Sequence, residues 1–151
     1  MSRTVFGALI GALLLPCAPA LGDDPADALR AKIDAESTKY LHDHPLKPSS
    51  VLDNSLKFAR LLGTAEEMAN TSCGSNRPDF PDLALESLHQ NTGVAMMVSF
   101  TEGMRAYIAE FPAEKRVLME NASNCIEESG HVYSTLKELR GLVSMLKRHG
   151  Y

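Results

Sequence analysis

The sequence has little of several residue types, and each shortage excludes a class of protein. It contains no tryptophan, 6% aromatic residues and three cysteines in 151 residues. Three cysteines cannot build the cysteine-dense frame of a small phospholipase-like domain. Eight prolines and ten glycines are too few for collagen or a low-complexity polymer. The formal net charge of −4 argues against a nucleic-acid binder that neutralises phosphates.

Motifs for catalysis and for cofactors are also missing. The chain has no CxxCH, no G-x-S-x-G, no H-E-x-x-H and no phosphate-binding glycine loop. These absences exclude a c-type cytochrome bundle and leave catalysis without a specific signal. With 44% hydrophobic and 23% charged residues, the composition is nevertheless that of a globular protein of one domain. We therefore favour a non-enzymatic protein over an enzyme, and we predict no cofactor.

The first 22 residues have the pattern of a secretory signal peptide. Arg3 is followed by the apolar run 5–15, by small residues and prolines, and then by two aspartates. This run of about 11 residues is shorter than the roughly 18 that a membrane-spanning helix needs. We predict that residues 1–22 are cleaved on export and that the mature protein is periplasmic or secreted. No later segment is long and apolar enough to predict a transmembrane helix.

The position of the cleavage stays open. Small residues at the required spacing allow a cut after Ala20 or after Gly22. We prefer the second, because Pro19 stiffens the extended peptide that the peptidase must hold. Lipoprotein processing at Cys17 is an alternative.

Removal of the leader would leave Cys73 and Cys125 as the only cysteines. Two cysteines in an exported domain predict a disulfide, because the periplasm and the extracellular medium oxidise thiols. The bond would close a loop of about 53 residues, and the entropy of loop closure makes it worth about 4 kcal/mol. Neither cysteine lies in a CxxC motif, which argues against a metal or redox role. Two free buried thiols are the alternative.

Apolar residues recur at helical spacing through most of the chain, and no run alternates with the period of a strand. Residues 23–49 predict a weakly apolar helix from Pro25, followed by a linker that contains Pro45 and Pro48. Residues 50–151 predict the main domain. We expect an all-α fold, a compact antiparallel bundle of four to five helices stapled by one disulfide.

Within residues 50–151 the helix ends are predicted from local signals. Ser50 followed by Asp53 resembles a capping box, and Gly74 suits a left-handed helix end. After a loop over 75–81, a third helix is expected to begin near Pro81-Asp82 and to continue to Phe111, with a bend or break at Asn91-Thr92-Gly93 as the alternative. A fourth helix is expected after Pro112, and Gly130 is expected to separate it from a fifth. We expect apolar side chains of the last two helices to pack inward: Val117, Leu118, Ile126, Val132, Leu136, Leu139, Val143 and Leu146.

The most apolar segment of the mature chain, residues 94–100, suggests one candidate site. Met96, Met97, Phe100 and Met104 could line a pocket for a small apolar ligand between helices. The same residues are also typical of adaptable core filling, the interpretation that their apolar surroundings favour.

Two Glu-x-x-His pairs suggest another candidate site. Glu86 with His89, and Glu128 with His131, have the spacing by which di-iron bundles bind metal. Gly130 lies inside the second pair, and Glu86 lies close to an expected helix start. These features favour surface pairs, with a metal site as the alternative.

One arrangement of short motifs lies within residues 60–126. Leu62-Gly63 and Glu66 precede Cys73-Gly74, and Phe100-x-x-Gly103 with Tyr107 precedes Cys125. The arrangement resembles a family of small exported helical proteins of Gram-negative bacteria whose function is uncharacterised. The resemblance implies a periplasmic, disulfide-stapled bundle, and it implies no activity.

These observations favour an exported helical binding or accessory protein whose partner is another envelope or secreted protein. A carrier of a small apolar ligand or lipid is the first alternative. A metal-binding or di-iron-type bundle is the second. The sequence does not specify the oligomeric state.

Overall fold

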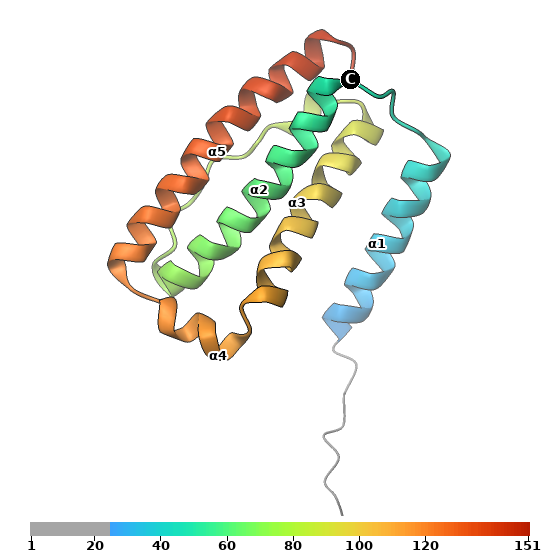
Figure 1. Ribbon diagram of the computed structural model, residues 1–151. Coiled ribbons are helices and arrows are strands. Elements are labelled where there is room, and N and C mark those ends of the chain that lie inside the picture. The colour runs from blue at the N-terminus through green and yellow to red at the C-terminus, as the bar shows by residue number, and fades with distance from the viewer. Residues whose placement is uncertain (1–24) are drawn as a thin grey trace, which may run out of the picture.

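The computed structural model describes residues 25–151, and this part of the chain is helical without a strand (Figure 1). The predicted signal peptide, residues 1–22, lies outside the described residues. The described part contains five α-helices: α1 (Pro25–Asp43), α2 (Ser50–Cys73), α3 (Gln90–Glu110), α4 (Ala113–Arg116) and α5 (Ala122–Arg148). It also contains three 3₁₀ turns: η1 (Gly74–Asn76), η2 (Leu85–Ser87) and η3 (Val117–Met119). The all-α class is confirmed.

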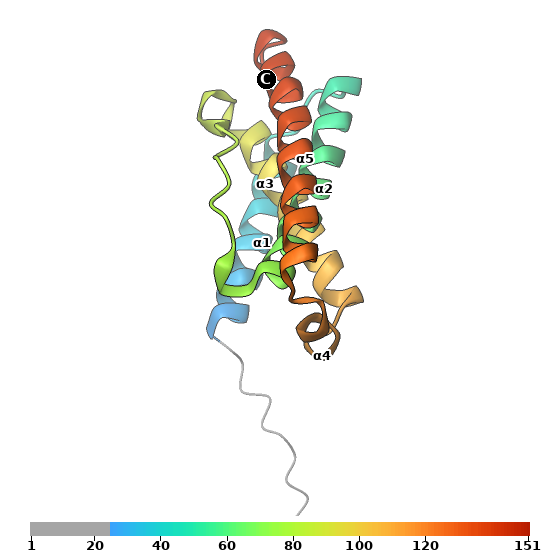
Figure 2. The same ribbon diagram turned by 90° about the vertical axis from the view of Figure 1, so that its left-hand side faces the viewer.

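Helix α2 lies between α3 and α5 and packs against both (Figure 1). Helix α5 runs antiparallel to α2, and α1 runs antiparallel to α3. Helices α2 and α3 themselves run in the same direction. This direction follows from residues 77–89, a segment that returns along the length of the bundle before α3 begins (Figure 2).

The core is a stripe on α2 facing a stripe on α5. Both stripes repeat every three or four residues, so each occupies one face of its helix. The buried residues are Leu52, Ala59, Leu62, Ala65 and Ala69 of α2, and Val132, Leu136, Leu139, Val143 and Leu146 of α5. The predicted burial of the residues from Val132 to Leu146 in this stripe is confirmed.

A helix follows Pro112, as predicted, but it is the short α4, and the prediction that Gly130 separates two helices was wrong. Gly130 does not end a helix, because α5 continues through it for 27 residues and its capping residue is Asn121. An interior glycine costs a helix only about 1 kcal/mol, which the buried stripe of α5 offsets. Val117 and Leu118 lie on η3 rather than in a packed helix, and together with Ile126 they are more than 70% exposed.

Helices α2 and α3 cross closely at two glycines. A methyl group on Gly63 would lie 1.9 Å from the carbonyl oxygen of Phe100, and one on Gly103 would lie 1.9 Å from that of Arg60. The hydroxyl of Thr64 donates to the carbonyl oxygen of Gly103 at 3.0 Å. The two backbones therefore meet directly, and the absence of a side chain at both glycines makes this possible.

Cys73, the last residue of α2, is joined to Cys125 in the first turn of α5, as predicted. Their sulfur atoms are 2.03 Å apart. Gly74 follows with φ of 53°, so the expected positive φ is present, although its ψ of −128° is not that of a left-handed helix. The disulfide fixes the lower end of the α2–α5 pair in Figure 1.

Two predicted helix starts were also wrong. Ser49, not Ser50, caps α2, because its side chain accepts a hydrogen bond from the amide of Leu52 at 3.1 Å. Helix α3 begins at Gln90 rather than near Asp82. Proline twice in four residues disfavours helix before residue 82, and Ala84 has a φ of 52°, which interrupts a helix after it.

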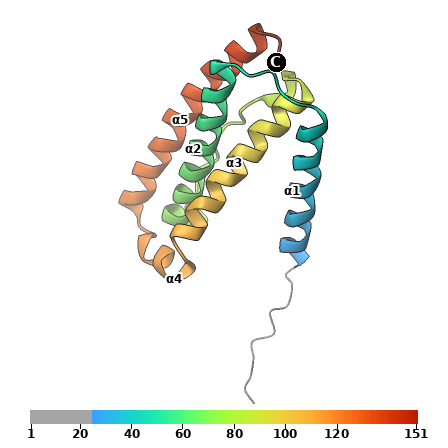
Figure 3. The same cartoon turned by 45° about the vertical axis from the view of Figure 1, so that its right-hand side comes forward.

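Helix α1 is attached loosely, as its weak apolar pattern suggests. None of its residues is buried, and Leu29 and Ile33 are more than half exposed. It lies beside α3 at one side of the bundle (Figure 3), where Asp34 forms an ion pair with Arg105 at 2.5 Å. Among the described residues, no helix combines the length and the apolar character needed to cross a bilayer.

Candidate ligand-binding groove

The segment 77–89, called the strap below, is held against α5 by side chains of that helix. Tyr133 donates to the carbonyl oxygen of Asp79 at 3.4 Å, Arg140 to that of Asp82 at 2.8 Å, and Lys147 to that of Ala84 at 3.3 Å. The three donors are seven residues apart, which is two turns, so they share one face of α5. The strap is therefore fixed to α5 along much of its length.

Apolar contacts add to these hydrogen bonds. The ring of Phe80 packs edge-to-face on Tyr133 with centroids 5.2 Å apart, a favourable aromatic geometry. Leu83 and Leu85 are half-buried against the core, and Leu88 is buried in it. The strap thus covers one side of the bundle without forming an α-helix of its own.

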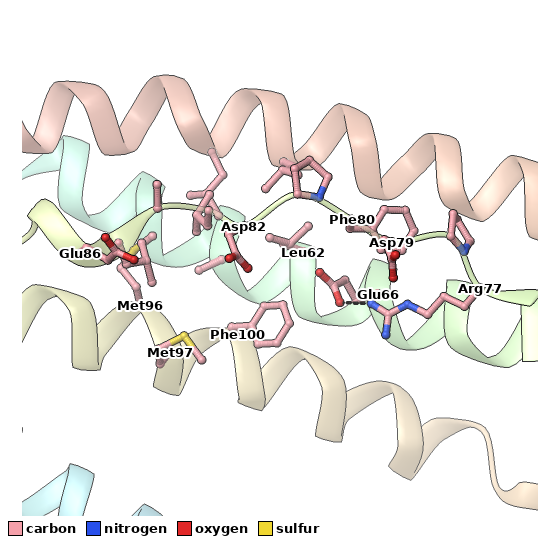
Figure 4. A pocket seen from close by; sticks show the side chains of 18 residues that line it. Leu62, Glu66, Arg77, Asp79, Phe80, Asp82, Glu86, Met96, Met97 and Phe100 are labelled. Carbon is pink, nitrogen blue, oxygen red and sulfur yellow. Dashed lines mark hydrogen bonds and ion pairs between the residues drawn. The ribbon is translucent and has the colours of Figure 1, made fainter. Parts of the chain in front are cut away.

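A groove of about 530 Å³ lies between the strap and helices α2, α3 and α5 (Figure 4). We call it the strap groove. Its apolar lining comes from all three helices and the strap: Ala59, Leu62, Met96, Met97, Phe100, Leu136, Leu139, Phe80, Leu83 and Leu85. A cavity of this size with a largely apolar floor is typical of small-molecule sites in proteins.

The polar lining of the strap groove is mostly acidic. Glu66 of α2 forms an ion pair with Arg77, whose guanidinium also lies 5.1 Å from the centre of the Phe80 ring. Asp79, Asp82 and Glu86 follow along the strap (Figure 4). None of the pairs found in residues 25–151 involves the carboxylates of these last three residues.

The structure places three of the four predicted pocket residues in this groove. Met96 is buried at its floor, Met97 is 52% exposed at its edge, and Phe100 lies between them in exposure. Met104 does not line it, because that residue lies one turn further along α3, near the crossing with Gly63. The same segment therefore supplies both core filling and groove lining.

Sequence reasoning missed the strap's contribution to the groove. We expected residues from Asp82 onward to be helical, so Phe80, Asp82 and Glu86 were not assigned to a common site. The apolar residues at 80, 83, 85 and 88 have an irregular 3-2-3 spacing that no single helix face can accommodate. This spacing argues against a helix here and could have indicated the strap.

The candidate metal ligands are not brought together. Glu86 lies on η2, and His89 lies outside it, immediately before α3. Glu128 and His131 lie one turn apart on α5, and Glu128 Oε2 is 3.3 Å from His131 Nδ1. Within residues 25–151, no three His, Cys, Asp or Glu side chains form a group that could hold a metal ion.

No known family, curated protein or solved structure matches this chain. The resemblance to small exported helical proteins stays a prediction, and the groove is interpreted from its own residues.

Proposed function

We propose that this protein is an exported, non-enzymatic binding protein that holds a small ligand with an apolar body in the strap groove. The observation that carries the proposal is the groove of about 530 Å³ whose floor is formed by apolar side chains of α2, α3 and α5. Its volume falls within the roughly 300–1,000 Å³ of typical ligand sites. A ligand there would remove apolar surface from water, both its own and that of Met97 and Phe100.

Two features support the compartment. Residues 1–22 have the pattern of a cleavable leader. The bond between Cys73 and Cys125 is of a kind that persists in oxidising compartments. A carrier or sensor in such a compartment would meet ligands that are free in the periplasm or medium.

The test uses a neutral apolar fluorophore, N-phenyl-1-naphthylamine, whose emission rises when it leaves water. We expect saturable binding to the purified protein. Met97→Asp should weaken it at least about five-fold, because a buried apolar contact of this size is worth about 1 kcal/mol or more.

The matched control is Leu118→Asp, which makes the same kind of change at an exposed apolar residue that does not line the groove. Both variants should retain the helical circular dichroism of the parent. Absence of saturable binding, or equal losses in the two variants, would contradict the proposal.

A second candidate function is contact with a partner protein at η3 and the start of α5. The exposed apolar residues Val117, Leu118 and Ile126 favour it. Exposed apolar side chains near one another in the chain are typical of protein contact sites. The same two variants separate the candidates. Leu118→Asp, and not Met97→Asp, should then abolish capture of a specific envelope protein.

A further inference from the structure

We infer that the ligand of the strap groove is a small amphiphilic cation, with an apolar body on the groove floor and a positive group beside the strap. The inference rests on the proposed function and adds the sign of the ligand's charge. Its basis is the contrast between an apolar floor and a wall that carries carboxylates (Figure 4).

The first step is the charge of the groove lining. Four carboxylates line the groove, those of Glu66, Asp79, Asp82 and Glu86, against a single cationic side chain, that of Arg77. The lining therefore has a net charge of −3 when these groups are ionised. Three of the four carboxylates, those of Asp79, Asp82 and Glu86, belong to the strap, and the fourth, that of Glu66, belongs to α2.

The second step is that Arg77 is already engaged. Its guanidinium pairs with Glu66 and lies over the Phe80 ring. Arg77 can neutralise Glu66 only. Among the described residues, no ion-pair partner is left for Asp79, Asp82 and Glu86.

The third step concerns the nearest cations of α5. Arg140 and Lys147 donate to the backbone carbonyls of Asp82 and Ala84, and neither side chain lines the groove. They hold the strap from its α5 side and reduce the local negative charge without cancelling it. A positive group arriving from the groove side would meet uncompensated carboxylates.

The fourth step is the chemistry of the opposite wall. Met97 and Phe100 of α3 face the strap across the groove. Thioether and aromatic groups tolerate an alkylammonium better than an anion, because the ring face is negative and the sulfur is polarisable. A fatty-acid-like ligand would bring a carboxylate toward three others and would be repelled.

The experiment compares three ligands of one chain length: octylammonium, octanol and octanoate. Each displaces N-phenyl-1-naphthylamine from the full protein at pH 7.5, where the alkylamine is protonated. We expect octylammonium to bind most tightly and octanoate least. Raising the salt concentration from 0.02 to 0.5 M should weaken octylammonium and leave octanol nearly unchanged, because salt screens only the charge term.

The variant Asp79→Asn/Asp82→Asn keeps side-chain size and leaves the backbone carbonyls that α5 contacts. Each lost carboxylate should weaken octylammonium about two- to five-fold, the range for exposed ion pairs, with little change for octanol. The control Glu114→Gln/Glu127→Gln removes two exposed carboxylates outside the groove and should change neither affinity.

The outcomes separate this inference from the proposed function. Equal binding of all three ligands, or octylammonium binding that is insensitive to Asp79→Asn/Asp82→Asn, overturns the charge preference and leaves an apolar groove. Tighter binding of octanoate overturns it as well. Failure of all three ligands and of the fluorophore itself overturns both.

Discussion

A methyl group added to Gly63 should separate helices α2 and α3. The added carbon would lie 1.9 Å from the carbonyl oxygen of Phe100, 2.8 Å from its carbonyl carbon and 3.2 Å from the amide nitrogen of Met104. All three atoms belong to the backbone, so no side-chain rotation relieves the overlap. Ordinary contact begins near 3.4 Å, and the helices must therefore move apart by about 1.5 Å at this point.

The magnitude follows from two opposed terms. Replacing glycine by alanine inside a helix gains about 0.5–1 kcal/mol from reduced chain entropy. Overpacking of a well-packed interior costs about 1–3 kcal/mol, and a backbone-to-backbone clash belongs at the upper end of that range. We expect Gly63→Ala to lower the free energy of unfolding by about 2 kcal/mol. Gly103→Ala should do the same, since its added carbon would lie 1.9 Å from the carbonyl oxygen of Arg60.

The chain provides its own control. Gly130 and Gly141 lie in α5, and a carbon added to either has no neighbour within 4 Å. Gly141→Ala should therefore show only the favourable term and raise the free energy of unfolding by about 0.5–1 kcal/mol. Urea denaturation followed by circular dichroism at 222 nm measures all three variants, and 1 kcal/mol corresponds to roughly 3–5 °C in thermal midpoint for a domain of this size.

Changes in stability of the same size and sign for Gly63→Ala and Gly141→Ala would refute the close contact between α2 and α3. That result would mean that the helices do not meet at Gly63 and Gly103. A double variant, Gly63→Ala/Gly103→Ala, should be less destabilised than the sum of the single ones, because one separation of the helices accommodates both methyl groups.

Two further predictions concern the disulfide and the carboxyl group of Asp43, whose pKa is lowered. Replacing Cys73 and Cys125 together by serine should lower the free energy of unfolding by about 4 kcal/mol and the thermal midpoint by roughly 10 °C or more. Reductant should not change the thermal midpoint of this variant. A parent protein with the same thermal midpoint with and without reductant would count against the bond. The hydrogen bond from Lys39, and after it that from His42, lowers the pKa of Asp43. Lys39→Ala should therefore raise the pKa of Asp43 toward its ordinary value in an NMR titration. A carboxyl group with a lowered pKa stabilises the folded state at pH values above its ordinary pKa. This stabilisation is lost as the pH falls through the lowered pKa. Stability should therefore decrease less on acidification in the variant than in the parent protein. An unchanged Asp43 titration in that variant would exclude Lys39 as the cause.

The helical elements with a strong apolar stripe could be predicted from the sequence. The residues Val132 to Leu146 repeat with helical period, and α5 buries them as that period requires. Burial also overrode a local signal in the same helix, because Gly130 is a weak breaker compared with six buried side chains. Tertiary packing, which a local motif does not contain, decided the outcome there.

The path of the strap could not be predicted in the same way. Its apolar residues are held by partners far away in the sequence, as when Tyr133 donates to the carbonyl of Asp79 and Arg140 to that of Asp82. No local pattern around either donor indicates that its partner is a backbone carbonyl some fifty residues earlier. The candidate site was therefore predicted on its helix side, at Met96, Met97 and Phe100, and missed on its strap side.

The two walls of the strap groove are fixed to different neighbours. Helix α3 is held against α2 by the contact of Gly63 and Gly103, and the strap is held against α5 by three hydrogen bonds. The width of the groove therefore depends on the placement of α2 relative to α5, which the core and the disulfide determine together. A site whose walls are set by the packing of the bundle is formed before the ligand arrives, so little binding energy is spent on ordering it. The apolar floor of the groove belongs to the core and cannot move away from it, so in the proposed function the floor would select the apolar body of the ligand beside the exposed acidic residues.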